Sequence, residues 1–523
     1  MKRIVNALLS WGRCTCTVLV LCAATAIGLR AQTFTTLHSF DGTDGADPWA
    51  GLVQGTDGNF YGTTSAGGNS ACTETSVRCG TVFKVTPSGE FTTLHFFCPE
   101  SSVCPYGAVP EAPLALAPNG DLIGSTNPEG TVFKITPSGR LTTVATFEGP
   151  GLEDPSGPLV LAANGDIYGT TGQGGANNWG TVFKITPGGT LTTLYNFCSQ
   201  SGCTDGQVPT GLYQATNGDL YGTTFLGGIN GAGTVFKITP GGTLTTLHRF
   251  CSQGVYPDCP DGSGPSWLIE GADGDFYGTT QSSGANHSPR GIGPGTVFKM
   301  SASGALTTLY SFCSQVTRDQ CTDGAQPTAG LVEASDGNFY GTTDSGGDQS
   351  PCDGTYDGPG CGTIFRITAG GVMTKLYTFC GLDADCTLYT FAGSPYPYAG
   401  FAGLLQATNG DFYGATFFGG NTGGDTGGAC GYGCGTLFSL SVGLRPFVKT
   451  QPHFGAAGAA ITILGTDLTG STSVTFNGTP AAFTIVSATE ITTTVPAAAT
   501  TGEVQVTTPG GTLASGGPFL VAP

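Results

Sequence analysis

One five-residue phrase, Gly-Thr-Val-Phe-Lys, recurs along the chain and constrains its fold more than any other feature. Together with the variants Gly-Thr-Ile-Phe-Arg and Gly-Thr-Leu-Phe-Ser, its seven copies begin at Gly80, Gly130, Gly180, Gly233, Gly295, Gly362 and Gly435. Successive copies begin 50, 50, 53, 62, 67 and 73 residues apart, while the phrases keep their length. The growing period therefore comes from loop insertions, and each copy marks one repeated structural unit.

Each unit contains four short apolar stretches separated by turn signals. In the sixth unit, residues 330–334 and 338–343 flank Asp336-Gly337, which predicts two strands joined by a two-residue primed turn, and strands at 362–368 and 376–379 follow. Long amphipathic helices are excluded, because 88 Gly and 32 Pro accompany only 18 basic and 36 acidic residues. Four antiparallel strands per unit predict a seven-bladed β-propeller over residues 33–441.

The two ends of the repeat array complement each other. The seventh phrase, at Gly435, is not followed by a Thr-Thr-Leu-Tyr-x-Phe strand, whereas one strand of this type, Thr35-Thr-Leu-His-Ser-Phe40, precedes the first unit. We expect this N-terminal strand to complete the last blade, because pairing it there closes the ring and leaves no open edge.

The sequence changes character near residue 446. Downstream, cysteine is absent, and β-branched runs such as Ile461-Thr-Ile-Leu464 and Val504-Gln-Val-Thr507 alternate with Gly and Pro. This pattern predicts an Ig-like β-sandwich over residues 446–523. The whole chain is therefore expected to be all-β.

The repeated phrases resemble the tandem repeat called GloVer, found in exported bacterial proteins. The resemblance covers the whole array through the Gly-Thr-Val-Phe-Lys copies, the Leu-Thr-Thr-Leu strands and a Tyr-Gly-Thr-Thr phrase that begins at Tyr61, Tyr168, Tyr221, Tyr277 and Tyr340. The second and seventh units depart from it at Leu122-Ile-Gly-Ser-Thr126 and Tyr413-Gly-Ala-Thr416. The C-terminal pattern is similar to an IPT/TIG domain. These resemblances imply a secreted or surface protein and bring no catalytic residues.

Residues 1–31 have the features of a Sec-type signal peptide, with Met-Lys-Arg first, an apolar stretch from Cys14 to Leu29, and cleavage expected after Ala31. A lipoprotein signal at Cys22 is a lesser alternative. No later segment has 18 uninterrupted apolar residues, so no membrane span is expected in the mature chain. Removing the leader takes away four basic residues and no acidic ones, and 14 minus 36 leaves a net charge of −22. This charge disfavours nucleic acid and anionic lipid as partners.

Three of the 19 cysteines lie in the leader, and the other 16 form eight close pairs. The pairs are Cys72 with Cys79, Cys98 with Cys104, Cys198 with Cys203, Cys251 with Cys259, Cys313 with Cys321, Cys352 with Cys361, Cys380 with Cys386, and Cys430 with Cys434. We predict eight disulfides, because the pairs lack the repeated two-residue spacing and the His partners of zinc ribbons. All eight fall in loops after the second or fourth strand of a unit, which is one end of the predicted blades.

Most repeated polar residues are interpreted as scaffold. His38, His95 and His248 share a strand register with Tyr195 and Tyr310, and this interchange indicates packing. The basic residues of the repeated phrase form either a cationic ring for an anionic ligand or, as the favoured interpretation, a solvent-facing part of the scaffold. They are Lys84, Lys134, Lys184, Lys237, Lys299 and Arg366. No catalytic, cofactor-binding or metal-ligating set is nominated.

Aromatic and acidic residues are likewise divided into scaffold residues and ligand candidates. Adjacent aromatic pairs point to opposite faces of a buried strand and indicate core: Phe60-Tyr61, Phe276-Tyr277, Phe339-Tyr340 and Phe412-Tyr413. Aromatics in variable loops are better ligand candidates: Tyr106, Trp179, Tyr256, Tyr356, Tyr396 and Tyr432. Two acidic groups suggest calcium: Asp41, Asp44 and Asp47, and Asp353 with Asp357. The first lacks the spacing of a calcium loop, and acidic turns are ordinary on a chain this negative.

Two functions are compatible with this pattern. The favoured one is a secreted or cell-surface, non-catalytic binding protein whose glycan or protein ligand contacts the variable, disulfide-rich loops, since the turns at the other end barely vary. The alternative is a polysaccharide hydrolase or lyase acting at the propeller channel through Glu270 and Glu333. These carboxylates share a register on the innermost strand with Gln54, Gln214 and Gln406, so a polar channel lining is the simpler interpretation.

Overall fold

The computed structural model describes residues 32–522, apart from 69–78, 99–106, 128–129, 148–154, 156, 163, 253, 255–257, 287–292, 318–319, 348–361, 380–387, 390–402 and 421–433. The described residues form β-strands and one short 3-10 turn, η2 (Ser201–Cys203), with no α-helix among them. In this part of the chain, no helix is long and apolar enough to cross a membrane. The all-β class expected from the sequence is confirmed.

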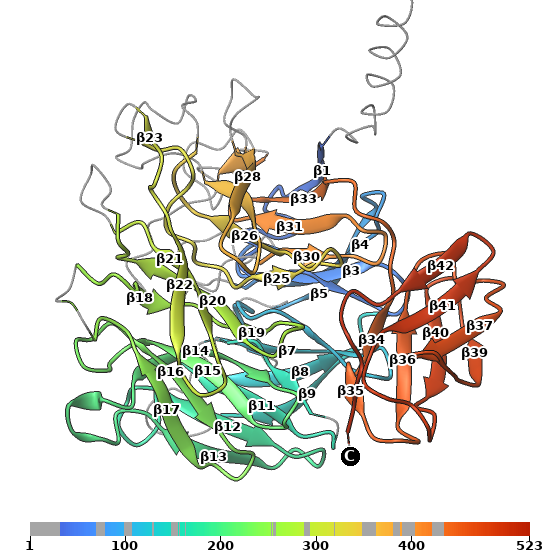
Figure 1. Cartoon of the computed structure of the whole chain (residues 1–523), viewed down its shortest axis with the longest axis horizontal. Coiled ribbons are helices and arrows are strands. Elements are labelled where there is room, and N and C mark those ends of the chain that lie inside the picture. Colours follow the sequence, from blue (N-terminus) through green and yellow to red (C-terminus); the bar gives the residue numbers. More distant parts are fainter. Residues whose placement is uncertain are drawn as a thin grey trace, which may run out of the picture.

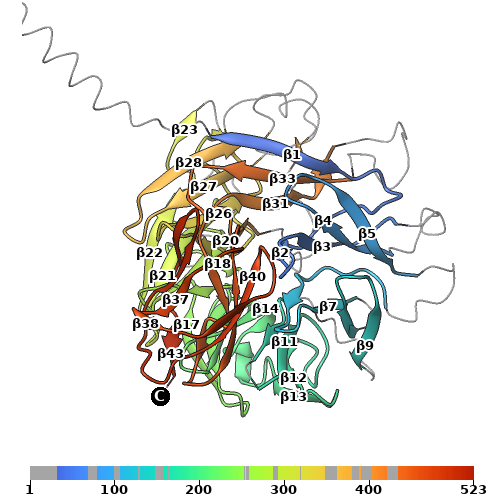
Figure 2. The ribbon, with the colours of Figure 1, turned by 90° about the vertical axis from the view of Figure 1, so that its right-hand side faces the viewer.

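The repeats form seven antiparallel sheets, called sheets 1 to 7 (Figures 1 and 2). Sheet 1 contains β2 (Val53–Gln54), β3 (Phe60–Thr64), β4 (Thr81–Val85) and β5 (Phe91–Phe96); sheet 2 contains β6 (Ala115–Leu116), β7 (Leu122–Thr126), β8 (Thr131–Ile135) and β9 (Leu141–Thr146). Sheet 3 contains β10 (Val160–Leu161), β11 (Ile167–Thr171), β12 (Thr181–Ile185) and β13 (Leu191–Asn196); sheet 4 contains β14 (Gln207–Gln214), β15 (Leu220–Leu226), β16 (Thr234–Ile238) and β17 (Leu244–Arg249). Sheet 5 contains β18 (Ser263–Pro265), β19 (Ile269–Glu270), β20 (Phe276–Ser282), β21 (Thr296–Met300) and β22 (Leu306–Ser311). Sheet 6 contains β25 (Val332–Glu333), β26 (Phe339–Thr343), β27 (Thr363–Ile367) and β28 (Met373–Thr378); sheet 7 contains β30 (Leu405–Gln406), β31 (Phe412–Thr416), β33 (Thr436–Ser441) and β1 (Thr33–Ser39).

The C-terminal domain is a sandwich of two sheets (red in Figure 1). One sheet has the order β34 (Lys449–Gln451), β36 (Ala460–Leu464), β40 (Glu490–Thr494), β39 (Phe483–Ile485); the other has the order β38 (Thr479–Pro480), β37 (Ser473–Phe476), β41 (Val504–Thr508), β42 (Gly511–Ala514). The remaining strands form three short pairs: β35 (Phe454–Gly455) with β43 (Leu520–Val521), β23 (Val316–Thr317) with β24 (Gln320–Cys321), and β29 (Leu388–Tyr389) with β32 (Phe418–Gly419). Apolar side chains from both sheets of the sandwich, including Ile463, Phe476 and Val506, form its separate core.

The N-terminal strand pairs with the last repeat. β1 lies antiparallel to β33, from Thr33 opposite Ser441 to Ser39 opposite Thr436, so the blue strand lies beside the orange one in Figure 1. A strand from the start of the chain thus supplies the outer strand of sheet 7, as the sequence predicted.

Each sheet packs on the next through one hydrophobic cluster, and a further cluster joins sheet 7 to sheet 1. The same contact recurs in all seven clusters, between a Phe just after an outer strand and the Phe of the next repeated phrase. The pairs are Phe40–Phe83, Phe97–Phe133, Phe147–Phe183, Phe197–Phe236, Phe250–Phe298, Phe312–Phe365 and Phe379–Phe438, with centroids 4.9 to 5.7 Å apart. Edge-to-face aromatic packing therefore holds every sheet against its neighbour.

Two threonines of the repeated phrases satisfy each other inside every sheet. One is the last Thr of Tyr-Gly-Thr-Thr, or Thr126 and Thr416 in the two units that depart from this phrase; the other is the Thr of Gly-Thr-Val-Phe and its variants. Both are buried, and their hydroxyls lie 2.7 to 2.9 Å apart in all seven units. In the sixth unit the pair is Thr343 and Thr363. A buried hydroxyl needs a hydrogen-bond partner, and here each threonine provides that partner for the other.

The reversal between the first two strands differs from the primed turn expected at Asp336-Gly337, and that expectation is wrong. Gly337 has a φ of 72°, but Asp336 is not in the left-handed region. The amide of Gly337 donates to the oxygen of Ala334, and the Ala334 amide donates to the oxygen of Asn338. This is a longer turn with a single left-handed glycine, which Asn-Gly and Asp-Gly satisfy equally well.

The glycine of Tyr-Gly-Thr-Thr is required by close packing. A Cβ on Gly341 would lie 2.7 Å from the Phe365 ring and 2.9 Å from Leu331. We therefore expect Gly341→Ala to lower the free energy of unfolding by about 1 to 3 kcal/mol, measured by denaturant titration. Gly370→Ala is the control, because its Cβ would meet nothing nearer than 3.7 Å. Equal effects of the two substitutions would contradict this account, and Phe365→Leu should recover part of the loss caused by Gly341→Ala.

Candidate functional site

The loops that follow the fourth strands of sheets 3, 4 and 5 are each closed by a disulfide. Cys198 is bonded to Cys203, Cys251 to Cys259 and Cys313 to Cys321. Cys79, Cys98 and Cys434 are disulfide-bonded as well. The other predicted members, Cys72, Cys104, Cys352, Cys361, Cys380, Cys386 and Cys430, lie outside the described residues.

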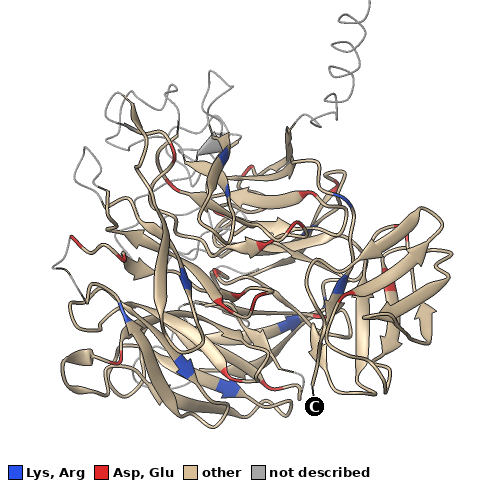
Figure 3. Cartoon of the chain, viewed as in Figure 1, with Lys and Arg blue, Asp and Glu red and all other residues tan. Residues whose placement is uncertain are grey.

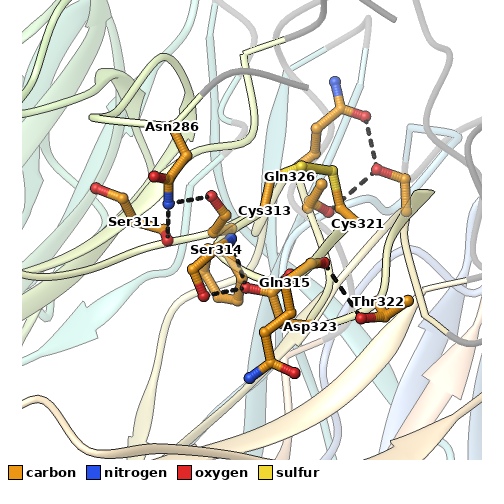
Figure 4. The surroundings of a disulfide bond; sticks show 12 residues. Asn286, Ser311, Cys313, Ser314, Gln315, Cys321, Thr322, Asp323 and Gln326 are labelled. Carbon is orange, nitrogen blue, oxygen red and sulfur yellow. Dashed lines mark hydrogen bonds between the residues drawn. A yellow bond between two sulfur atoms is a disulfide. The ribbon is translucent and has the colours of Figure 1, made fainter. Parts of the chain in front are cut away.

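A buried carboxylate fixes the same loops from inside. Asp323 is 2% exposed and accepts hydrogen bonds from the Tyr310 hydroxyl at 2.6 Å and from the Ser314 amide and hydroxyl at 2.9 Å each. Figure 4 shows this carboxylate beside the Cys313–Cys321 bond. Asp205 holds the loop of sheet 3 in the same way, by accepting from Tyr195 and Ser199. The loops of sheets 3 and 5 are thus each held by a disulfide and by the hydrogen bonds of a buried Asp.

Histidine replaces tyrosine as the hydrogen-bonding partner in two other units. His248 Nε2 lies 3.0 Å from Asp261, and His38 Nε2 lies 2.7 Å from Asp44. The interpretation of this register as packing alone is therefore wrong for these units, because the ring carries a polar atom that reaches the loop carboxylate. The second unit has Ala145 at this register and makes no such bond through its side chain. Burial of the tyrosine hydroxyl at this position raises the pKa of Tyr195 to about 12.

A sequence signal for these carboxylates exists and was missed. Cys203, Cys259 and Cys321 are each followed by one residue and then Asp-Gly. The glycines, Gly206, Gly262 and Gly324, have φ of 107°, 95° and 103°, a region that side chains rarely adopt. The spacing Cys-x-Asp-Gly thus encodes the turn that points the carboxylate back at the strand.

Three large apolar side chains are exposed at this end of the sheets. Trp179 is 39% exposed, Ile229 is 60% exposed and Val316 is 47% exposed. All three follow the second or fourth strand of their sheets, as the disulfides do. Of the loop aromatics singled out from the sequence, Trp179 alone lies in the described residues; Tyr106, Tyr256, Tyr356, Tyr396 and Tyr432 lie outside them.

Four lysines of the repeated phrase pair with Asp residues of the hairpin turns, at the opposite end of the sheets. Figure 3 shows how the basic and acidic residues are distributed over the described chain. The pairs are Lys134–Asp121 at 3.5 Å, Lys184–Asp166 at 3.9 Å, Lys237–Asp219 at 3.3 Å, and Lys299 with Asp273 and Asp275 at 2.8 Å each. A lysine matched to a carboxylate of its own sheet offers little net charge to an anionic ligand, which favours the scaffold interpretation.

In the first acidic group suggested for calcium, Asp41 and Asp44 make hydrogen bonds inside their own turn. Asp41 accepts from the Thr43 amide at 2.9 Å and from the Thr43 hydroxyl at 2.7 Å, and this bonding lowers its pKa. Asp44 accepts from the Asp41 amide at 3.0 Å as well as contacting His38. Asp353 and Asp357 lie outside the described residues.

The C-terminal domain contacts the tight-turn end of the sheets. The Thr489 hydroxyl donates to the oxygen of Thr56 at 2.7 Å, and the Phe447 amide donates to the oxygen of Thr408 at 2.9 Å. The Gln451 side chain donates to the oxygen of Leu116 on β6. Since Thr56 and Thr408 belong to the turns after the innermost strands, this domain and the disulfide-closed loops lie at opposite ends.

The carboxylates of the alternative enzymatic hypothesis, Glu270 and Glu333, join neighbouring sheets. Glu270 accepts from the Thr216 amide at 3.0 Å, and Glu333 accepts from the Ala272 amide at 3.0 Å. Gln406 and Gln54 make the equivalent bonds to the amides of Ser335 and Thr408, at 2.8 and 3.1 Å. The shared register therefore ties the innermost strand of one sheet to the turn of the preceding sheet.

A cavity of about 320 Å³ lies where these innermost strands meet the C-terminal domain. Its polar lining includes Tyr213, Glu270, Glu333, Lys449 and His453. Burial raises the pKa of Tyr213, with a further contribution from the two glutamates, and burial also raises the pKa of Glu333. This group of side chains was not identified from the sequence, because it forms only when the C-terminal domain docks.

Tandem antiparallel sheets with anchored loops, followed by a two-sheet sandwich, define an all-β repeat protein with an Ig-like C-terminal domain. The sequence profile of the Gloeobacter/Verrucomicrobia repeat matches residues 24–209 and 198–394, and that of the IPT/TIG domain matches residues 448–521. The chain belongs to the Gloeobacter/Verrucomicrobia repeat family and carries a C-terminal IPT/TIG domain, which confirms both resemblances. No curated protein matches the chain.

Similar solved structures are distant. A fungal alcohol oxidase of the AA5 family, in complex with copper, is 13% identical, with 94% of this chain and 99% of that chain covered and a TM-score of 0.48. The extracellular domain of a protein described as a hybrid two-component system of B. thetaiotaomicron is 11% identical, with 94% and 58% covered and a TM-score of 0.46. A gluconolactonase from Xanthomonas campestris is 14% identical, with 62% and 90% covered and a TM-score of 0.35.

Proposed function

We propose that this protein is a secreted or cell-surface binding protein, in which residues 1–31 are a signal peptide, residues 33–441 form a seven-bladed β-propeller and residues 446–523 form the IPT/TIG domain. The cyclic series of inter-sheet clusters and the pairing of β1 with β33 support the propeller. Its glycan or protein ligand contacts the end of the blades that carries the disulfide-closed loops.

The observation that carries this proposal is the double anchoring of those loops. A disulfide and a hydrogen-bonded Asp restrict each of these loops of sheets 3 to 5, and the Asp is buried in sheets 3 and 5, so little conformational entropy remains to be lost on binding. The same end exposes Trp179, a residue type that often dominates binding energies, and the apolar side chain of Ile229. The opposite end is in contact with the C-terminal domain.

Polysaccharide hydrolysis or lysis through Glu270 and Glu333 is not proposed. Both carboxylates accept a backbone amide of the neighbouring sheet, and Glu270 also accepts from the Thr216 hydroxyl at 3.1 Å. These bonds give the two residues a role in joining the sheets.

The binding end can be tested with substitutions matched for exposure. A glycan array and lysine crosslinking of the purified mature chain would identify the ligand, and Trp179→Ala and Ile229→Ser are then expected to weaken binding about tenfold or more. Val372→Ser is the control, because Val372 is 65% exposed in a tight turn at the other end. Loss of binding in the Val372 variant with no loss in the other two would place the ligand at the tight-turn end of the sheets and overturn the proposal.

A further inference from the structure

Lys449 has no acidic partner among the described residues, in contrast to four lysines of the repeated phrase, Lys134, Lys184, Lys237 and Lys299. It is the first residue of β34 in the C-terminal domain, and its Nζ donates to the main-chain oxygen of Gln406 on β30. Among the described residues, no carboxylate lies within 4.0 Å of Nζ, whereas Lys134, Lys237 and Lys299 each have one. The partly buried Lys449 therefore lacks the close ion pair that these four lysines have.

This environment favours the uncharged amine. Burial lowers the pKa of Lys449 from 10.5 to about 8. Close to that pH, about half of the molecules carry a neutral amine, which donates one N–H to the Gln406 oxygen and keeps a free electron pair. By contrast, hydrogen bonds to Asp273 and Asp275 raise the pKa of Lys299 and keep it charged.

Lys449 also lines a cavity that can admit a small molecule. Lys449 lines the 320 Å³ cavity described above, together with Tyr213, Glu270, Glu333 and His453. Burial lowers the pKa of His453 and raises that of Tyr213, so imidazole and phenol are both neutral there. Cavities with converging polar groups at a domain interface are characteristic ligand sites.

We propose that Lys449 is a nucleophilic amine that forms a Schiff base with a small neutral aldehyde or ketone bound in this cavity. The neutral amine attacks the carbonyl carbon, a C–N bond forms, and the C=O π pair moves to oxygen. A proton passes from nitrogen to that oxygen, giving a carbinolamine. The C–O bond then breaks, hydroxide leaves with a second proton as water, and the imine remains, so one carbonyl compound is consumed and one water released.

The lining restricts the class of carbonyl compound. Glu270 and Glu333 disfavour anionic carbonyl compounds such as keto acids, and their oxygens can accept hydrogen bonds from hydroxyl groups. A volume of about 320 Å³ suits a molecule of a few carbons. Short hydroxyaldehydes, the open-chain form of small sugars, combine these properties.

Reductive trapping tests the proposal directly on the intact mature chain. We would incubate it with D-glyceraldehyde and sodium cyanoborohydride at pH 8 and measure the adduct on each lysine by peptide mass spectrometry. Lys449 is expected to be modified at least about tenfold faster than Lys299, given the opposite shifts of their pKa values. Its rate should rise with pH to a plateau above about 8.

Two substitutions provide the controls. Lys449→Met should abolish the fast modification seen on the whole protein, and Lys299→Met should retain it. Melting curves show whether both variants fold; if Lys449→Met does not, the site-resolved rates in the parent protein decide alone. A Lys449 rate no greater than that of Lys299, or one still rising beyond pH 10, would overturn the proposal.

Discussion

Deletion of residues 32–40 is expected to lower the melting temperature of the repeat sheets by about 5 to 10 °C and to promote aggregation. β1 pairs with β33, so its loss exposes the ladder edge of sheet 7. The deletion also removes Phe34, whose ring stacks 4.2 Å from that of Tyr377 on sheet 6, and Phe40, which is fully buried against Phe83 of sheet 1. The effect is large because this one strand holds three sheets together.

Calorimetry and light scattering on the truncated mature chain measure both effects. A matched pair of point variants separates packing from strand pairing: Phe40→Ala should cost about 3 to 5 kcal/mol, while Phe96→Ala, at a side chain 39% exposed, should cost much less. A truncated protein that melts and stays monomeric like its parent would show that β1 does not close the array.

The strands and their order could be predicted from the sequence because each repeat carries its own local signals. Alternating apolar residues, a Gly-containing turn and a repeated phrase act over a few residues, and seven copies reinforce the same assignment. Even the distant pairing of β1 with β33 was predictable, because the array has one strand too many at its start and one too few at its end. The turn type was missed because Asn-Gly and Asp-Gly fit more than one geometry.

The polar contacts between different elements could not be predicted from these local signals. The carboxylate of Asp323 reaches Tyr310 thirteen residues away, and this contact depends on a left-handed Gly324 and on the path of the intervening loop. The cavity beside Lys449 depends on the docking of two domains, for which the sequence contains no repeated signal. Repeated local signals in the sequence thus specify the sheets, whereas the candidate sites depend on individual contacts that no repeated signal encodes.

Asp323→Ala is expected to lower the free energy of unfolding by about 3 to 5 kcal/mol and to expose the loop of residues 313–323 to proteases. The substitution removes three hydrogen bonds to a charged acceptor, each worth roughly 1.5 to 3 kcal/mol, and leaves the partly buried Tyr310 hydroxyl without its carboxylate. Asp323→Asn keeps one acceptor oxygen in the same volume and should cost less. Thermal melts and limited proteolysis would measure these differences.

The size of the Asp323 effect should depend on the disulfide that closes the same loop. In the parent protein the Cys313–Cys321 bond limits the conformations open to the loop, so the carboxylate binds a nearly preformed partner. Replacing both cysteines by Ser lets the loop leave the strand, and Asp323→Ala should then cost at least about 1 kcal/mol less than in the parent. Thr317→Ala, an exposed change in the same loop, should have little effect in either background. Strictly additive costs would show that the two anchors act independently, and the preorganisation on which the proposed binding end depends would lose its physical basis.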